Sequence, residues 1–231
     1  GGSDGLSGIT ANPAVGRFSD MMAARGGSTV LTEVPEMFGA EGFLMNRCVT
    51  REVFDKAVHM INGFKNYFIS HNEVVYDNPS PGNRQGGITT LEDKSCGCVQ
   101  KGGTAPIMDV IGYGDPVVTK GLNMLYGPGN DLVSATAMTA AGAHMILFTT
   151  GRGTPFGAPA PTLKLATNTE LAEKKKGWID FNAGPIADGE SIDDAAKRLL
   201  KLVIEIAGGK QKKAEEKGFR EISIFKDGVV L

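Results

Sequence analysis

The stretch DLVSATAMTAAGAHMILFTTGRGT, residues 131–154, decides the fold class. Its first part, Asp131–Ala143, is rich in small residues and predicts a helix. His144–Thr149 is an apolar run of the length of a buried strand, and it passes directly into the Gly- and Pro-rich loop Thr150–Pro161. A helix that leads into a buried strand and then a loop is typical of an α/β fold with a largely parallel sheet.

The same alternation continues on both sides of this unit. Ser, Thr or Asn at the first cap, Pro at the first helical position and Gly after the last turn predict further helices. Short β-rich runs between them predict further strands. The expected helices run from Asn12-Pro13 to near Gly26-Gly27, from Pro35 to about Arg47, from Thr50 to about Ser70, and over Ser191–Ala207; the expected strands are Ser28–Glu33, Ile107–Ile111, Leu163–Ala166 and Glu221–Phe225.

Residues 1–231 are therefore expected to form one α/β domain: a Rossmann-like layered arrangement with a largely parallel sheet and flanking helices. A charged helical tail is expected from about residue 170. The polar segment Val74–Pro106 has almost no hydrophobic period. Loops longer than about 15 residues tend to be functional when they are ordered, so we expect this segment to be a long functional loop.

Composition narrows the function class. The formal net charge is −2, so we expect no nucleic-acid partner. We also expect no membrane span or secretory signal, because no apolar run reaches 18 residues and the first residues lack the signal pattern. The three cysteines, Cys48, Cys96 and Cys98, fit reduced thiols and predict a cytoplasmic protein. Glycine is the outlier: 32 of 231 residues lie in short polar clusters, which favours an enzyme with ordered loops over a scaffold.

The segment Gly1–Pro13 joins hydroxyl, carboxylate and amide groups to a helix start. Such an end presents free N–H groups and suits a carboxylate or phosphate, although an ordinary capped helix explains the same residues. Gly1-x-Ser3-x-Gly5 also has the spacing of a serine-hydrolase elbow, but the preceding strand and a His late in the chain are not found. The candidate ligand-binding residues here are Ser3, Asp4, Ser7, Thr10 and Asn12.

Glu33 and Glu36 follow an expected strand. Two carboxylates at such a place can hold a divalent metal ion, while the alternative is one acid in a first helical turn and one exposed acid.

The Val74–Pro106 segment contains the amides Asn78 and Asn83 and a charged run with Lys94. A lysine beside acids is usually an ion pair, but burial lowers a lysine pKa and can make the residue a general base.

Arg152 stands between two glycines in the loop after the strand His144–Thr149. Loops at the carboxyl ends of strands are the favoured ligand position in α/β folds, and an arginine there can bind a carboxylate through two parallel hydrogen bonds. Asp180 and Asn182 could reach the same site or form a turn. The three histidines show no paired metal-ligand spacing, and Cys96-Gly97-Cys98 is not a CxxC motif.

Taken in order, five blocks resemble the altronate dehydratase / galactarate dehydratase family, in its carboxy-terminal domain. The blocks are Gly1–Pro13, Glu33–Glu41, Asn78–Lys101, Phe148–Gly153, and Asp180–Gly184 with Asn168. The resemblance implies a cytosolic bacterial hydro-lyase that uses Fe(II), or Mn or Mg, to remove water from a sugar acid and leave a 2-keto-3-deoxy acid. It also implies amino-terminal and middle domains outside these residues, a Cys just before Gly1, and it admits a homodimer.

For β-elimination in such an enzyme, we expect Lys94 as the base, with Asp4 also catalytic. Arg152 is expected to bind the substrate carboxylate, and Glu33 or Glu36 to help hold the metal. The polyol or carboxylate is expected to contact Ser3, Ser7, Thr10, Asn12 and Asn83. Two alternatives stay open: a lyase like the beta subunit of sulfolactate sulfo-lyase, which expels sulfite, and a binding or dimerisation domain whose chemistry lies elsewhere.

Overall fold

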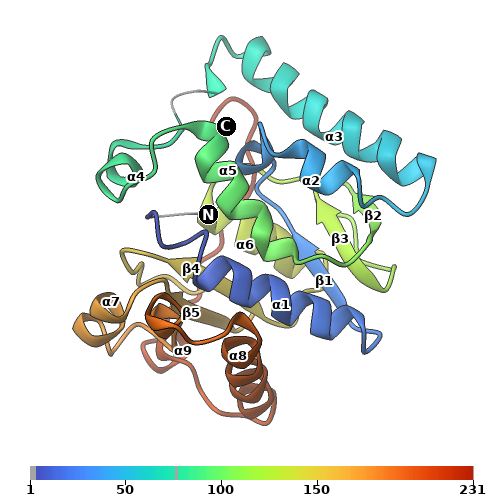
Figure 1. Ribbon diagram of the computed structural model, residues 1–231. Coiled ribbons are helices and arrows are strands. Elements are labelled where there is room, and N and C mark those ends of the chain that lie inside the picture. Colours follow the sequence, from blue (N-terminus) through green and yellow to red (C-terminus); the bar gives the residue numbers. More distant parts are fainter. Residues whose placement is uncertain (1–3, 76–77, 231) are drawn as a thin grey trace.

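The computed structural model describes residues 4–75 and 78–230, and it confirms an α/β fold with parallel strands. The strands are divided between two three-stranded sheets instead of lying in one (Figure 1). The first sheet has the order β1-β3-β2, formed by β1 (Ser28–Leu31), β3 (Gly121–Leu125) and β2 (Ile107–Ile111). The second has the order β4-β5-β6, formed by β4 (Ile146–Thr150), β5 (Thr162–Ala166) and β6 (Phe181–Asn182). All pairs within both sheets are parallel.

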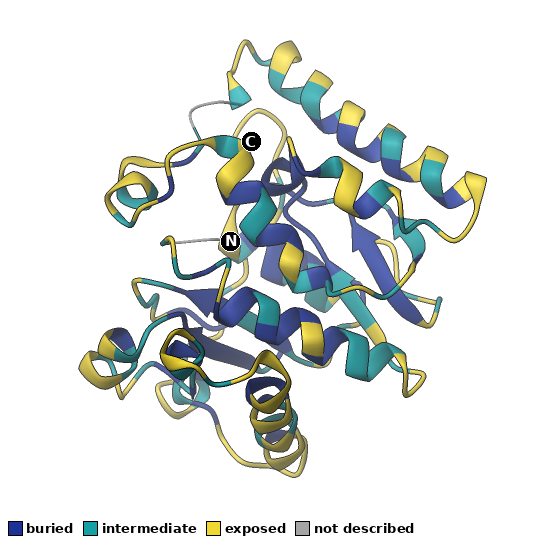
Figure 2. Cartoon of the chain, viewed as in Figure 1, coloured by how far each residue is buried: buried dark blue, intermediate teal, exposed yellow. Residues whose placement is uncertain are grey.

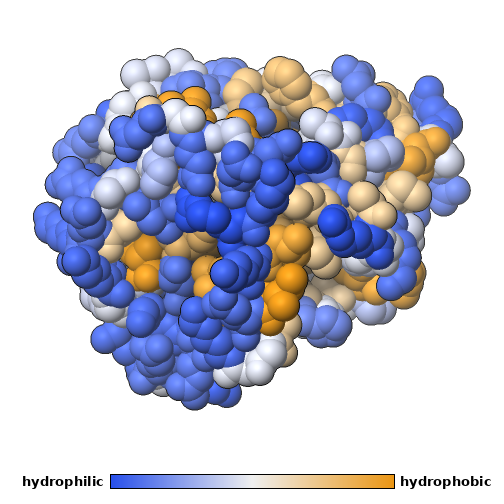
Figure 3. All heavy atoms as spheres, turned by 60° about the horizontal axis from the view of Figure 1, so that its bottom comes forward, coloured by the Kyte–Doolittle hydropathy of each residue, from blue (hydrophilic) through white to orange (hydrophobic). Residues whose placement is uncertain are grey.

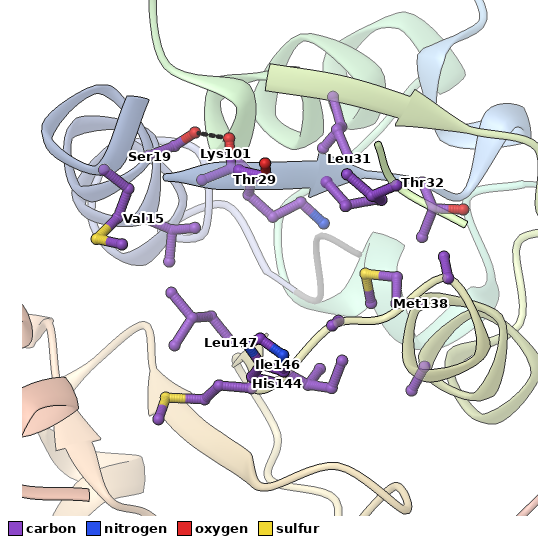
Figure 4. A pocket seen from close by; sticks show the side chains of 18 of the residues that line it. Val15, Ser19, Thr29, Leu31, Thr32, Lys101, Met138, His144, Ile146 and Leu147 are labelled. Carbon is purple, nitrogen blue, oxygen red and sulfur yellow. Dashed lines mark hydrogen bonds between the residues drawn. The ribbon is translucent and has the colours of Figure 1, made fainter. Parts of the chain in front are cut away.

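Two helices lie beside both sheets. Helix α1 (Ala11–Ala23) packs against β1, β3 and β4, and also against α8 (Ile192–Ala207). Helix α6 (Asp131–Ala140) connects β3 to β4 and lies on the opposite side from α1 (Figure 4). Burial follows this arrangement, because the strands are mostly buried and the outer faces of α3 (Arg51–Ser70) and α8 are exposed (Figure 2).

The prediction of a long loop over Val74–Pro106 was wrong. The segment contains α4 (Pro81–Gln85), α5 (Leu91–Val99) and a 3-10 turn η3 (Gln100–Gly102). Thr90 caps α5 by accepting a hydrogen bond from the backbone N–H of Asp93. The helix has no clear apolar stripe because its buried face includes polar residues, among them Lys94 and Ser95.

Helices α3, α6 and α8 appear where they were expected. The side chains of Thr50 and Ser191 cap α3 and α8, as predicted. The helix expected from Pro35 to Arg47 is divided into η1 (Val34–Met37) and α2 (Glu41–Met45), since Gly39 takes a φ of 85° between them. Thr10, not Asn12, precedes the first residue of α1, and Asn12 is fully buried within the helix.

The predicted strand Glu221–Phe225 was also wrong. This segment is irregular, and its backbone N–H groups at Ser223 and Phe225 donate to the side chains of Thr136 and Tyr113 instead of to a neighbouring strand. Strands β3 and β6 were not predicted. Strand β6 has only two residues, and β3, with the sequence GLNML, contains no β-branched or aromatic residue that would favour a strand. The last part of the chain also contains α7 (Thr169–Lys174), η4 (Gly184–Asp188) and α9 (Lys213–Glu216), and residues 217–230 form neither helix nor strand.

Hydrophilic residues cover most of the surface that Figure 3 shows, and hydrophobic residues lie there in separate patches. Among the described residues, no helix is long and apolar enough to cross a membrane.

Candidate functional site

Two groups of polar side chains lie at the carboxyl ends of the strands, the position at which parallel α/β folds bind ligands. The first, which we call the ion cluster, follows β1 and includes residues of η1, α5 and η3: Glu33, Glu36, Lys94, Cys98 and Lys101. The second, which we call the Asp4 cluster, lies at the ends of β4 and β5: Asp4, Ser7, Thr167 and Asn168.

Glu36 is the centre of the ion cluster. Its carboxylate forms an ion pair with Lys94 at 2.9 Å, and it accepts a hydrogen bond from the thiol of Cys98 at 3.1 Å. Lys94 also donates to the side-chain oxygen of Asn78 at 2.7 Å. All three charged or thiol side chains are at least nine-tenths buried, so this pair is shielded from water and salt.

Glu33 and Lys101 extend the cluster toward β1. The Lys101 ammonium lies 3.7 Å from a Glu33 carboxylate oxygen, and both side chains are largely buried. Glu33 has a φ of 65° and a ψ of 65°, a left-handed conformation that costs a non-glycine residue roughly 1–3 kcal/mol. Such strain is typical of sites where a side chain must point in a particular direction.

We expected burial to lower the pKa of Lys94, but its surroundings raise it. Burial alone lowers the pKa of Lys94, but the charge and hydrogen bond of Glu36 raise it above its ordinary value. In the described arrangement Lys94 is therefore an ammonium group. Burial and the Glu36 charge also raise the pKa of Cys98 to about 12, so its thiol stays protonated.

The ion cluster does not by itself fit a divalent metal. Glu33 and Glu36, the predicted ligands, lie beside Lys101 and Lys94, whose positive charges compete with a cation. Within residues 4–75 and 78–230, no three His, Cys, Asp or Glu side chains are arranged to hold a metal ion. The residues described here therefore carry too few ligands for Fe(II), Mn or Mg.

The Asp4 cluster is built from neutral donors. One carboxylate oxygen of Asp4 accepts from the backbone N–H and the hydroxyl of Ser7, at 3.0 and 2.8 Å. The other accepts from the Thr167 hydroxyl at 2.8 Å and from the Asn168 amide at 3.2 Å. These four donors hold Asp4 in one orientation beside Gly151, the residue that follows β4.

Asn12 connects the two clusters. Its amide donates to the backbone carbonyl of Gly97 in α5 at 3.0 Å, and its oxygen accepts from the Thr149 hydroxyl at the end of β4 at 2.8 Å. Thr10 donates to the backbone carbonyls of Leu6 and Thr167, both at 2.7 Å. Both side chains are fully buried, so they position the loop and are not open to a ligand in this arrangement.

Arg152 and Asp4 line one open cavity of about 400 Å³. Arg152 is exposed, donates to the Gln85 side chain at 3.2 Å, and lies directly against Gly82 of α4, where a larger residue would overlap its guanidinium. Among the described residues, the cavity is lined by Asp4, Gly5, Leu6, Gln85, Gly86, Gly151 and Arg152.

Two other predicted site residues, Asn83 and Ser3, are not among the described residues that line this cavity. Asn83 closes the capping box of α4 by accepting from the backbone N–H and hydroxyl of Ser80, so part of its hydrogen bonding is structural. Ser3 lies outside the described residues. Asp180 likewise accepts from the backbone N–H groups of Lys164 and Lys213, which favours the structural interpretation of that residue.

Sequence reasoning did not select Cys98, Lys101 or Thr167. Lys94, Cys98 and Lys101 have the spacing i, i+4, i+7, which places side chains on one face of a helix. That signal is visible only if the segment is predicted to be helical. Thr167 has no signal of its own, because it reaches Asp4 across 163 residues.

Comparison with known proteins finds the same family that the sequence blocks resemble. A family model described as "D-galactarate/Altronate dehydratase, C-terminal" matches residues 1–230. The whole chain is 57% identical to altronate dehydratase of Escherichia coli (strain K12) and 58% identical to altronate dehydratase of Bacillus subtilis (strain 168), and it covers 47% of each. It is 38% identical to galactarate dehydratase (L-threo-forming) of E. coli K12 over 92% of the chain and 41% of the relative.

A more distant relative is (2R)-sulfolactate sulfo-lyase subunit beta of Chromohalobacter salexigens, 30% identical over 96% of the chain and 58% of the relative. The chain spans about half the length of the two altronate dehydratases, and the matched family model corresponds to a carboxy-terminal part.

Proposed function

We propose that this chain, which belongs to the D-galactarate/altronate dehydratase family as its carboxy-terminal part, forms one wall of the sugar-acid site of a hydro-lyase. The reaction is the removal of water from an aldonate or aldarate, such as altronate or galactarate, to give a 2-keto-3-deoxy acid. The cavity shared by Arg152 and Asp4 carries this proposal, because it places a cation and a fixed carboxylate in one open space. As part of the proposal, the enzyme is cytoplasmic; its three free thiols fit a reducing compartment.

Each end of the cavity has its own role. The Arg152 guanidinium is free on one side to bind a substrate carboxylate through parallel hydrogen bonds, which also disperses negative charge as the enediolate forms. Asp4 is held by four donors and accepts hydrogen bonds from substrate hydroxyls, or receives a proton from the substrate. Ser7 and Asn83 act by positioning Asp4 and α4.

Lys94 remains the proposed base only with a condition. Because its pairing with Glu36 keeps it an ammonium group, Lys94 must first transfer a proton to the Glu36 carboxylate before its neutral amine can accept the α-proton of the substrate. Measuring exchange of the α-proton with solvent in the full-length enzyme separates the two acceptors. Loss of exchange in Lys94→Met with retained substrate affinity supports Lys94, whereas loss in Asp4→Asn and persistence in Lys94→Met moves the role to Asp4.

A divalent metal belongs to the proposal through the family resemblance alone. When bound, such an ion would stabilise the enediolate and the leaving hydroxide. Glu33 and Glu36 are too few ligands for such an ion, so its other ligands would come from outside the described residues. Metal analysis of the full-length Glu36→Gln variant decides whether Glu36 belongs to the ligand set, because unchanged metal content removes it.

The role of Arg152 has a direct kinetic test. In the full-length enzyme, we expect Arg152→Ala to raise KM for the sugar acid about 10- to 100-fold, the cost of losing a charge-assisted bidentate contact. Arg84→Ala is the matched control. Arg84 is also an exposed arginine and lies nearby in α4, but it does not line the cavity. Equal effects of the two substitutions would contradict the proposal.

A second candidate function is elimination of sulfite from sulfolactate, which the 30% identity to the sulfo-lyase subunit favours. Both reactions eliminate a group β to a carboxylate, so the same cavity suits both. A panel of altronate, galactarate and sulfolactate, read out as keto acid and as sulfite, chooses between them. Absence of turnover together with absence of ligand at Asp4 and Arg152 would favour the third view, a binding or dimerisation domain.

A further inference from the structure

The two sheets face each other through β1 and β4, the strands at their neighbouring edges. Strand β1 ends the first sheet and β4 begins the second, and no ladder joins them in the described residues. Between these edges lies a cavity of about 610 Å³, which we call the strand slot; β1 and β4 form two of its walls, and α1 and α6 form the other two (Figure 4). Packed protein interiors seldom contain voids much larger than a water molecule, so a cavity of this size needs an explanation.

Both edge strands point in the same direction. The Ser19 hydroxyl, late in α1, donates to Thr29 near the start of β1 at 2.8 Å. Asn12, early in α1, accepts from Thr149 near the end of β4 at 2.8 Å. Helix α1 is therefore antiparallel to β1 and to β4, so the two strands are parallel to each other.

The helices on the two sides complete the pattern of a doubly wound sheet. The connection β3-α6-β4 carries the chain from the first sheet to the second past the slot, on the face opposite α1. The order β2-β3-β1, then the slot, then β4-β5-β6 is that of one parallel sheet with one position empty in its middle. In such a sheet every strand is covered by helices on both faces.

The slot offers what a central strand requires. Apolar side chains face it from both helices: Val15, Phe18 and Met22 from α1, and Ala135 and Met138 from α6. The polar lining residues of these helices are Ser19 in α1 and Asp131 and Ser134 in the first turn of α6. Side chains of a strand alternate between its two faces, and a continuous apolar run would bury both sets. No strand among residues 4–75 and 78–230 pairs with the slot-facing edges of β1 and β4, and a small apolar ligand could not hydrogen-bond along a strand edge as another strand does.

We propose that the strand slot receives one parallel, apolar β-strand from the half of the full-length enzyme that this chain does not include. The chain spans 47% of each altronate dehydratase it matches, so a long stretch of polypeptide is available in such an enzyme. A strand parallel to β4 and β5 would end on the side of Asp4, which lies beside Gly151 and Thr167 directly after those strands. Residues that follow the strand would thus reach the candidate site.

This inference rests on family membership and on the slot, not on the proposed reaction, and it is tested without substrate. The first measurement is hydrogen–deuterium exchange in the full-length enzyme. We expect the amides of β1 and β4 to exchange as slowly as those of β3 and β5, because a central strand protects both edges. Exchange about 100-fold faster in β1 and β4 would overturn the proposal, as would protection that depends on protein concentration (a second copy) or disappears on dialysis (a small ligand).

A cavity-filling substitution gives the second measurement, also in the full-length enzyme. Met138 points from α6 into the slot (Figure 4), so Met138→Trp must compete with the inserted strand, and we expect Tm to fall by several degrees. If the slot is empty in the enzyme, the larger side chain fills it and Tm is unchanged or rises, which would contradict the proposal. Ala140→Trp, on the exposed end of the same helix and outside the slot, is the control and is expected to change Tm little.

Discussion

The ion cluster and the Asp4 cluster both place a carboxylate at the carboxyl end of a sheet, but they stabilise it in different ways. Glu36 is buried and is neutralised by the full charge of Lys94. Asp4 is half-buried and is held by hydroxyl, amide and backbone donors that carry no net charge. The Asp4 carboxylate thus lines an open cavity, while the charge of Glu36 is compensated inside the protein.

The difference indicates different tasks. A buried ion pair gains little net free energy over an apolar pair but is costly to break, so it holds α5 and η1 in one arrangement. A carboxylate bound by neutral donors can exchange one of them for a substrate group at small cost. We infer that the Asp4 cluster meets the ligand and that the ion cluster organises the site, in addition to the role proposed for Lys94 as a base.

The largest expected effect comes from breaking the buried pair. Lys94→Met leaves Glu36 charged and buried, and we expect it to lower the free energy of unfolding by about 3–5 kcal/mol, measured by denaturant titration. Adding Glu36→Gln should recover much of this loss, because no uncompensated charge remains. If the double variant is as unstable as Lys94→Met, burial of the charge is not the cause.

The Glu36–Lys94 pair also predicts that the free energy of unfolding depends on pH. Burial opposes ionisation of Glu36, but positive charges that include Lys94 and Lys101 lower its pKa below the ordinary value of 4.5. Its stabilising contribution is therefore complete above pH 4.5 and is lost as pH falls through the lowered pKa. The difference in unfolding free energy between the wild type and Glu36→Gln should shrink below pH 4.5; a difference that stays constant down to pH 2 would contradict the assignment.

The next effect tests the contact that joins α1 to the ion cluster. A Cβ on Gly16 would overlap the backbone carbonyl of Gln100 in η3, so Gly16→Ala should lower the unfolding free energy by about 1–3 kcal/mol. Gly63→Ala in α3 is the control, since nothing lies near its Cβ position and alanine favours a helix by about 1 kcal/mol. Thermal unfolding of both variants should shift Tm in opposite directions.

The expected effect on stability at Asp4 is no larger than that at Gly16. Asp4→Asn turns one acceptor into a donor that faces Ser7 or Thr167, and we expect a loss of about 1–3 kcal/mol at most. Activity of the full-length enzyme should fall much more than stability if Asp4 meets the substrate. Loss of activity in proportion to the loss of folded protein would assign Asp4 a structural role only.

Local patterns were enough for much of the fold. The capping residues Thr50 and Ser191 and the apolar runs at β1, β2, β4 and β5 follow from propensities that act within a few residues. The same kind of signal made Asp4 and Arg152 candidates, because one lies in a Gly-rich loop before a helix and the other in a Gly-rich loop after a strand. The strand predicted at Glu221–Phe225 failed because its alternating pattern meets side-chain acceptors instead of a sheet edge.

The sequence by itself determined the α/β class, the principal helices and strands, and the family blocks, since each is encoded by residues close together in the chain. Only the tertiary structure decided which charges meet. The pairing of Lys94 with Glu36 and the contact of Thr167 with Asp4 join residues 58 and 163 positions apart. Tertiary packing also left the slot between β1 and β4, because strand order and sheet edges depend on how distant segments associate and no local propensity specifies them.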